Sequence, residues 1–212
     1  MEVLDSVVIG AGQAGLSSSF HLRRRGIEHV VLDSNAEAGG AWQHRWRSLT
    51  MRDVHGVAAL PELDVPIGSD REPARTFVPA YFRDYEQTYD LPILRPIRVR
   101  AVRDDPSTGS GTGGLLIVEA ADRTWTTRTL INATGTWTHP FVPHYPGQET
   151  FLGRQLHTVD YDGPEEMAGL HVGGVGGGAS AIQLLGEIAP VAAGTTWVTR
   201  RPPVWRTEDF TP

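Results

Sequence analysis

The sequence predicts an α/β protein that contains two β-α-β units, one in each half of the chain. Short apolar runs at residues 6–9 and 170–175 end in glycines, and each is followed by a stretch with helical spacing of small and apolar residues. A second β-prone run closes each unit, at residues 29–32 and 196–199. This repetition of one module predicts two related domains.

The first unit carries the pattern Gly10-x-Gly12-x-x-Gly15, between its first strand and a helix expected over residues 14–25. The first glycine permits a tight turn, the second lets phosphates approach backbone amides, and the third lets helix and strand pack closely. Asp33 ends the second strand, where a carboxylate can accept hydrogen bonds from ribose hydroxyls. The unit is therefore predicted to be Rossmann-like and to bind a dinucleotide.

NAD and FAD both fit this geometry. The unit lies at the start of the chain and is followed by Gly39 and Gly40, a close-approach turn with Trp42 beside it. These two features favour FAD. Without the glycines, core packing would be the simpler interpretation of Trp42.

The second unit carries Gly176-x-Gly178-x-x-Ala181, and its closing strand runs into Arg200 and Arg201. NAD binding requires an acid at that strand end, whereas arginine accommodates the 2′-phosphate of NADPH through charge-assisted bonds. We therefore expect NADPH; a solvated basic strand end is the alternative. Gly173 and Gly174 interrupt the first strand of this unit and are expected to weaken it.

Between the two units the pattern changes from helical to extended. Residues 79–89 are predicted to form a helix with Pro79 at its start. Three β-prone runs follow, the first two joined by a flexible hairpin tip at residues 107–114. The runs cover residues 97–102, 115–120 and 125–133.

Composition excludes several classes of function. The net charge of −6 gives no basic footprint, so nucleic acid is not an expected partner. No apolar run approaches the roughly 20 residues of a membrane-spanning helix, and the N-terminus has no signal-peptide pattern, so we expect a cytoplasmic protein without a membrane partner. The chain has no cysteine, which excludes disulfides, thiolate metal sites and a dithiol relay. No metal site is expected.

Three segments together resemble the FAD-binding elements of flavin-containing monooxygenases: Gly10-Ala-Gly-Gln-Ala-Gly15, Gly39-Gly-x-Trp42 and Asn132-Ala-Thr-Gly135. The resemblance implies a three-layer FAD/NAD(P)-binding fold with two nested Rossmann-like domains, the second incomplete. It implies that residues 1–150 form the FAD domain, with a β-meander at about 97–135, and that 151–212 form a connector and the start of the NADPH domain.

A fourth segment, Phe151-x-Gly153-x-x-x-His157-x-x-x-Tyr161, resembles the fingerprint of class B flavoprotein monooxygenases. Tyrosine at its last position is similar to the heteroatom-oxidising branch, whereas Baeyer–Villiger relatives usually have tryptophan there. The resemblance implies that this segment shapes the domain hinge and the nicotinamide side. Considered alone, His157 would be interpreted as a structural histidine.

The glycine motifs and the resemblance together predict two sets of cofactor ligands. Arg52 and Asp53 follow a segment that lines the flavin in the family, so they are the candidates for a catalytic role, with a surface salt bridge as the alternative. The FAD set is Gly10, Gly12, Gln13, Ala14, Gly15, Asp33, Ser34, Gly40, Trp42, Val99, Thr134 and Gly135; the NADPH set is Gly176, Gly178, Ser180, Ala181, Arg200 and Arg201.

The reaction that the resemblance implies is hydride transfer from NADPH to FAD, followed by oxygen addition to form a flavin hydroperoxide that oxygenates a small molecule. Two alternatives stay open: an NAD(P)H-dependent reductase that passes electrons to a soluble acceptor, and a non-catalytic fragment. About 40 residues follow Leu170, whereas a domain usually takes about 100, so we expect a truncated chain. The substrate and the oligomeric state stay open.

Overall fold

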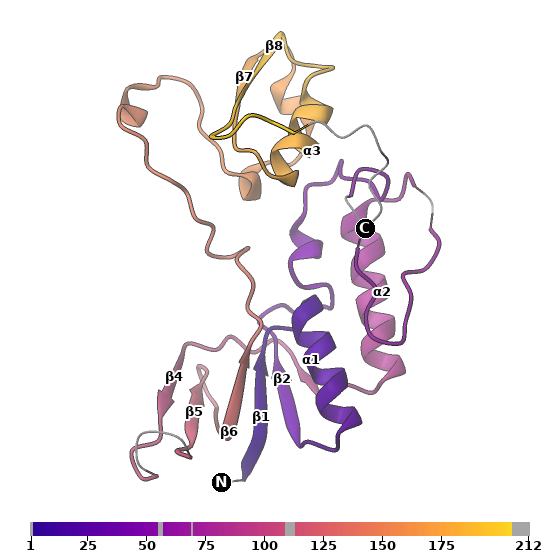
Figure 1. Ribbon diagram of the computed structural model, residues 1–212, viewed down its shortest axis with the longest axis vertical. Helices are drawn as coiled ribbons and strands as arrows, with labels where there is room; N and C mark the ends of the chain where they lie inside the picture. The colour runs from indigo at the N-terminus through magenta and orange to yellow at the C-terminus, as the bar shows by residue number, and fades with distance from the viewer. Residues whose placement is uncertain (1, 55–56, 69, 109–112, 205–212) are drawn as a thin grey trace. The chain divides into compact units, whose positions relative to one another are not determined.

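The computed structural model describes residues 2–54, 57–68, 70–108 and 113–204. The chain forms two compact units that interleave along the sequence (Figure 1). A single boundary near residue 150 does not divide them, because two early segments pack with the later part of the chain. Unit 1 comprises Met1–Gln43, Ala59–Pro66 and Val78–His139, and unit 2 comprises His44–Ala58, Ile67–Phe77 and Pro140–Pro212.

Unit 1 is built on a six-stranded sheet in the order β3-β2-β1-β6-β5-β4 (Figure 1). The strands β3, β2, β1 and β6 run parallel, and β5 and β4 continue the sheet in antiparallel pairing. This arrangement confirms the predicted α/β class. The strands are β1 (Val3–Ile9), β2 (His29–Leu32), β3 (Ile93–Leu94), β4 (Ala101–Asp104), β5 (Leu116–Glu119) and β6 (Thr124–Asn132).

The core of unit 1 follows from the apolar runs. Every residue of β2 is buried, as expected for a parallel strand covered on both faces. Helix α1 (Gln13–Arg24) buries Leu16 and Phe20, and its basic side chains gather in the last turn, where they complement the helix dipole. Gly26 then adopts a φ of +67°, which glycine adopts without strain, and ends the helix.

Helix α2 (Ala74–Thr88) begins before Pro79, so the prediction that Pro79 starts the helix was wrong. Pro73 precedes the helix instead, and its carbonyl accepts hydrogen bonds from the N–H groups of Thr76 and Phe77 at 2.9 and 3.1 Å. Pro79 lies inside the helix and packs on Gly39, where an added Cβ would come within 2.7 Å of its side chain. Proline has no backbone N–H, so the helix lacks one hydrogen bond at this position, but the ring of Pro79 makes a close packing contact with Gly39.

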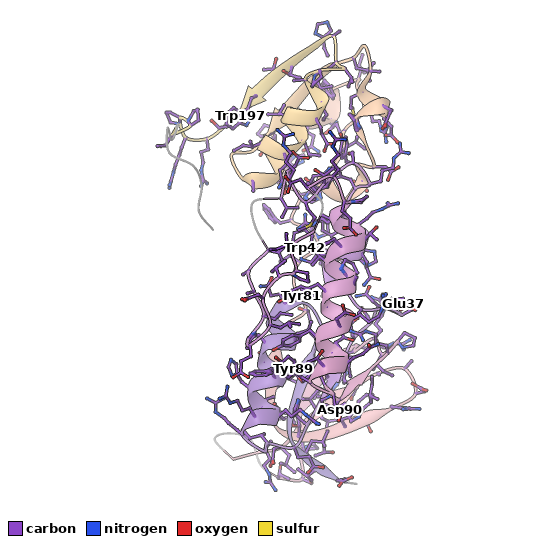
Figure 2. The ribbon with its side chains drawn as sticks, turned by 90° about the vertical axis from the view of Figure 1, so that its right-hand side faces the viewer. Glu37, Trp42, Tyr81, Tyr89, Asp90 and Trp197 are labelled. Carbon is purple, nitrogen blue, oxygen red and sulfur yellow. The ribbon has the colours of Figure 1, made fainter. Side chains whose placement is uncertain are left out.

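Two tyrosines of α2, and Tyr89 directly after its last residue, hold an irregular segment at residues 60–63. Tyr81 and Tyr85 are 2% and 0% exposed, and Figure 2 labels Tyr81 in α2 and Tyr89, which follows the helix. The spacing of four residues puts all three side chains on one face. The hydroxyls of Tyr81, Tyr85 and Tyr89 donate to the carbonyls of Leu63 (2.6 Å), Pro61 (3.0 Å) and Glu62 (2.9 Å), and Tyr81 also accepts from the N–H of Leu60 (2.8 Å).

The predicted first meander strand at 97–102 was placed too early, because β4 begins at Ala101. The residues before β4 still form backbone hydrogen bonds to neighbouring parts of the sheet. The N–H of Ile97 donates to the carbonyl of Asp33, after β2, at 2.7 Å, and the N–H of Arg100 donates to the carbonyl of Glu119, in β5, at 2.7 Å. The antiparallel β4–β5–β6 meander itself is present. Residues 109–112, at the tip of the predicted hairpin, lie outside the described residues.

Unit 2 contains the second β-α-β arrangement, formed by β7 (His171–Val175), α3 (Ala179–Ile188) and β8 (Gly194–Val198) (Figure 1). The two strands pair in parallel from His171 with Gly194 to Val175 with Val198. Strand β7 forms across both glycines that were expected to weaken it. A Cβ on Gly174 would lie 3.1 Å from Leu185, so this glycine allows α3 to lie close to the strand.

Within the described part of the chain, no helix combines the length and apolar character that crossing a membrane requires.

Candidate functional site

The glycine-rich turn after β1 is shaped by the absence of side chains at two positions. Gly10 has a φ of +99°, and a Cβ there would lie 2.4 Å from the carbonyl oxygen of Ala133. A Cβ on Gly15 would lie 1.9 Å from the carbonyl oxygen of Gly10. Glycine is therefore required at both positions for the turn to pack between β6 and α1.

Gly12 has a different role from its two neighbours in the motif. It precedes α1 with extended backbone angles, and no atom lies within 4 Å of where its Cβ would be. The first N–H groups of a helix have no acceptor within the helix, and together with the helix dipole they attract anions. The open space beside Gly12 at the start of α1 therefore fits the approach of a pyrophosphate to backbone amides.

The other two predicted FAD segments meet this turn. Gly40 has a φ of +52°, and a Cβ there would lie 2.8 Å from the Cα of Gly12, so the two turns are in direct contact. Trp42 follows in a short 3₁₀ helix, η1 (Gly40–His44), with its N–H bound to the carbonyl of Gly39 at 3.0 Å. Its side chain is partly buried, and Figure 2 marks its place in the chain.

On the other side, the end of β6 lies against the same turn. The N–H of Ala133 donates to the Ile9 carbonyl at 2.9 Å, and the Asn132 side chain accepts from the N–H and hydroxyl of Thr134 at 3.2 and 2.9 Å. Gly135 then adopts a φ of +64°. The structure thus brings together three segments that are far apart in the sequence.

Asp33 lies beneath the turn. It is 3% exposed, and its two oxygens accept from the N–H of Ala11 (2.6 Å) and the N–H of Asn35 (2.7 Å). The sequence predicted that this carboxylate accepts from ribose hydroxyls. A carboxylate has about four acceptor positions, so two remain for a ligand, but in this structure Asp33 organises the backbone of the turn.

The remaining FAD candidates lie near these segments. Gln13 and Ala14 are the first residues of α1, and Ser34 is exposed next to Asp33. Val99 is partly buried and packs against the core cluster of Val7, Val30, Leu32 and Val118. A direct contact between Val99 and a cofactor stays a prediction.

The second glycine-rich turn in unit 2 has a related geometry. Gly176 has a φ of +139°, and Gly178 precedes α3 with no atom within 4 Å of where its Cβ would be. Ser180 and Ala181 lie in the first turn of α3, and the Ala181 Cβ would be 3.8 Å from a Cβ on Gly176. The indole N–H of Trp197 on β8 donates to the Gly176 carbonyl at 2.7 Å. Sequence reasoning missed Trp197, because a lone strand tryptophan gives no signal of such a bond.

Arg200 and Arg201 follow β8 on the edge of the strand pair that carries the turn. Because Val175 pairs with Val198, the residues after each strand emerge at the same edge. Both arginines are exposed, and the hydroxyl of Thr199 donates to the Arg201 carbonyl at 2.6 Å. This placement fits recognition of an anionic group near the second turn.

The predicted fingerprint segment is locally folded. A Cβ on Gly153 would lie 2.5 Å from the ring of Phe151, so this ring occupies the space over the glycine. His157 caps the 3₁₀ helix η3 (Thr158–Asp160): its Nδ1 accepts from the N–H of Val159 at 3.3 Å, while Asp160 accepts from the N–H of His157 at 3.2 Å. His157 therefore has a structural role here.

Tyr161, the last residue of the fingerprint, is 5% exposed and meets Trp46 edge-to-face, with ring centroids 6.0 Å apart. The neighbouring Arg47 donates from its N–H to the Asp162 carbonyl at 3.2 Å and forms ion pairs with Asp162 and Glu165. The fingerprint and the segment around Trp46 therefore pack together within unit 2. Sequence reasoning did not single out Trp46 or Arg47.

Arg52 and Asp53 border a cavity of about 390 Å³ within unit 2. The Asp53 carboxylate accepts from the Thr50 hydroxyl at 2.6 Å, and the Gln183 side chain of α3 donates to the Asp53 carbonyl at 2.9 Å. Asp53 is therefore held by hydrogen bonds to Thr50 and α3. The cavity is lined by Ser48, Leu49, Arg52, Asp53, Ile182, Gln183, Gly186 and Glu187.

Among the described residues, no group of three or more histidine, aspartate or glutamate side chains could hold a metal ion.

The fold and the two glycine-rich turns define an α/β protein with two Rossmann-like nucleotide-binding units. The chain belongs to the pyridine nucleotide-disulphide oxidoreductase family, whose model matches residues 7–211.

Among solved structures, the chain is similar to a flavin monooxygenase from Stenotrophomonas maltophilia, a double-substitution variant, with 45% identity and a TM-score of 0.86. The similarity covers 99% of this chain and 61% of that chain. OTEMO in complex with FAD and NADP shares the fold, with 24% identity, a TM-score of 0.64, and coverage of 92% of this chain and 38% of that chain.

Among curated proteins, the chain is 31% identical to a Baeyer-Villiger monooxygenase from Streptomyces coelicolor, over 93% of this chain and 38% of that protein. The chain spans about half the length of other curated relatives, such as an uncharacterized oxidoreductase, CzcO, from Bacillus velezensis (52%). Its relatives thus include flavin monooxygenases considerably longer than these 212 residues.

Proposed function

We propose that this chain is the cofactor-binding part of an FAD-dependent monooxygenase that uses NADPH and oxygen to oxygenate a small molecule. The observation that carries the proposal is the meeting of the Gly10–Gly15 turn, the Gly40 turn and the Asn132–Gly135 segment at the start of α1. The similarity to flavin monooxygenases supports the identity of the cofactor and the class of reaction.

In this proposal the first turn binds FAD. The backbone N–H groups at the start of α1 hold its pyrophosphate, and Gly12 leaves the space for it. Asp33 keeps the turn in place through Ala11, and Trp42 and Thr134 line the approach from the two neighbouring segments. FAD bound there would supply the two-electron chemistry and the reaction with oxygen, since these belong to the cofactor.

The second turn, in this proposal, binds NADPH. Gly178 leaves space at the start of α3, as Gly12 does at α1. Arg200 and Arg201 recognise the 2′-phosphate through charge-assisted hydrogen bonds, which NADH cannot offer. The Trp197 indole fixes the carbonyl of Gly176 and so keeps the turn in the conformation that the phosphates require.

The test begins with the absorption spectrum of the protein after incubation with FAD and removal of free flavin. Anaerobic NADPH is then added, and the visible absorption band of the flavin is followed. We expect a bound flavin spectrum that bleaches with NADPH and returns when oxygen is admitted. A thioether probe present at that step should be recovered as its sulfoxide.

Each step has an outcome that contradicts one part of the proposal. A protein that stays colourless with FAD contradicts the assignment of the first turn. Bleaching that is equally fast with NADH contradicts the role of the arginines. Oxygen consumption without sulfoxide, together with fast reduction of a quinone, favours a reductase that passes electrons to a soluble acceptor.

A further inference from the structure

Buried donors gather around one carboxyl group in unit 2. Among the described residues, Trp46 Nε1, Ser48 Oγ and Tyr161 Oη are buried without a hydrogen-bond partner. Trp46 and Tyr161 are 2% and 5% exposed, so bulk solvent does not reach these side chains. A buried polar group without a partner destabilises the folded protein. Three of them in one place indicate a common acceptor.

The acceptor that faces them is Glu187, in the last turn of α3. Its side chain is partly buried and lines the cavity beside Arg52 and Asp53. Burial raises the pKa of Glu187, the nearby Ser48 hydroxyl and Trp46 indole lower it, and the charges of Asp53 and Glu165 raise it further; the net direction is upward. The two donors thus lie close to the carboxyl group, although neither of them meets the geometry of a hydrogen bond.

We propose that Glu187 is a positioning residue: its carboxyl group is the acceptor for the Trp46 indole and the Ser48 hydroxyl, and it fastens residues 46–53 to helix α3. One contact already joins residues 46–53 to α3, the bond from the Gln183 side chain to the Asp53 carbonyl at 2.9 Å. A small rotation of the side chains, or one water in the 390 Å³ cavity, completes the network.

The proposal concerns how Arg52 and Asp53 are held, and all its partners lie in unit 2. It requires no bound cofactor. Its failure is therefore distinguishable from a failure of the proposed function, which is tested by flavin binding and oxygenation. It also gives Tyr161 a physical role, because its ring packs edge-to-face on Trp46.

The pH dependence of stability tests this proposal, because it reports the charge of Glu187, whereas a side chain that only packs would leave stability independent of pH. The groups that face it are Arg52 and Asp53 from the segment, Glu165 from the 3₁₀ helix η4 (Pro164–Met167), and the hydroxyl of Tyr161. Because the pKa of Glu187 is raised by folding, its contribution to stability is fully present below the unfolded pKa of about 4.3. That contribution is lost as the pH rises through the higher folded value.

The experiment compares Glu187→Gln, Glu187→Ala and Ser48→Ala with the wild type, and Glu149→Gln, at an exposed position of unit 2, is the matched control. Thermal unfolding is measured from pH 5 to 8. Limited digestion with trypsin is followed by mass spectrometry after Arg52, with the cut after Arg103 in β4 of unit 1 as the internal reference.

We expect Glu187→Gln to unfold at a higher temperature than the wild type at pH 8, with a difference that shrinks toward pH 5. Glutamine keeps an acceptor oxygen and carries no charge. Glu187→Ala should raise the rate of cleavage after Arg52 roughly tenfold, because the segment loses its attachment to α3. The cut after Arg103 and the Glu149→Gln protein should be unchanged.

Two results would overturn the proposal. A Glu187→Gln protein that is less stable than the wild type at pH 8 would show a charged ion pair, for instance with Arg52, in place of the network. Unchanged cleavage after Arg52 in Glu187→Ala would show that the carboxyl group does not hold the segment. If Glu187→Ala does not fold, Ser48→Ala decides: about threefold faster cleavage supports the proposal, and an unchanged rate rejects it.

Discussion

The buried carboxylate of Asp33 accepts a hydrogen bond of 2.6 Å from the backbone N–H of Ala11, which lies inside the first glycine-rich turn. The bond connects the end of β2 to the turn after β1 and uses an N–H group that the turn leaves without a strand partner. Asp33 therefore determines the shape of the turn before any ligand arrives.

Replacing Asp33 with alanine should lower the free energy of unfolding by about 1–3 kcal/mol, because the buried N–H of Ala11 loses its acceptor. Asp33→Asn should lose less, since its amide oxygen still accepts one of the two bonds. Urea denaturation measures both changes, with Asp122→Asn at an exposed position as the control. Equal stability of Asp33→Ala and the wild type would contradict the role of Asp33 in the turn.

Substitutions at Gly12 and Gly15 should separate an effect on ligand binding from an effect on folding. A side chain at position 12 meets open space, so Gly12→Val should fold with near wild-type stability but lose FAD binding, because its methyl groups occupy the space of the pyrophosphate. A Cβ at position 15 would lie 1.9 Å from the Gly10 carbonyl, so Gly15→Ala should destabilise the fold itself. Circular dichroism and flavin titration of both variants make the comparison. FAD binding by Gly12→Val at wild-type affinity would refute the placement of the pyrophosphate.

Replacing Arg200 and Arg201 with alanine should weaken NADPH binding by roughly 10- to 100-fold and NADH binding much less, because only NADPH carries the 2′-phosphate. Kd values from anaerobic titration of both nucleotides give the ratio. The combined Arg98→Ala and Arg100→Ala variant, at two exposed arginines of unit 1, is the control for the loss of two positive charges. Equal losses for the two nucleotides would exclude the phosphate role.

Tyr81→Phe should lower the free energy of unfolding by about 1–3 kcal/mol, because the buried N–H of Leu60 loses its acceptor and the Leu63 carbonyl its donor. Tyr145→Phe, at a half-exposed residue, should be neutral within about 0.5 kcal/mol. Chemical denaturation at pH 7 compares the two. A neutral Tyr81→Phe would mean that the segment at residues 60–63 is held by packing alone.

Local features of the sequence predicted much of this structure. The two glycine-rich turns and their flanking strands and helices were expected within a few residues of their observed ends. Such turns are recognisable because a positive φ, or an approach closer than a Cβ permits, selects glycine at a fixed spacing. The start of α2 was missed because Pro73 and Pro79 give the same local signal, and only the fold distinguishes them.

Contacts between distant segments could not be predicted in this way. Tyr161 was selected through its place in the fingerprint, but its partner Trp46 comes from a segment more than a hundred residues earlier. Glu187 was not singled out, since a glutamate in a helix is normally a solvated residue. Its burial depends on the segment around Ser48, which the sequence left as irregular. The composition of the two compact units could not be predicted either, because each unit is assembled from three separate segments of the chain.

The ring of Phe151 over Gly153 gives the fingerprint spacing a simple physical basis. Because the ring fills the space of a Cβ at position 153, the two positions form one packing unit. A smaller residue at position 151 would release the requirement for glycine two residues later. Across relatives of this chain, a residue larger than glycine at position 153 should therefore occur mainly where position 151 is smaller than phenylalanine.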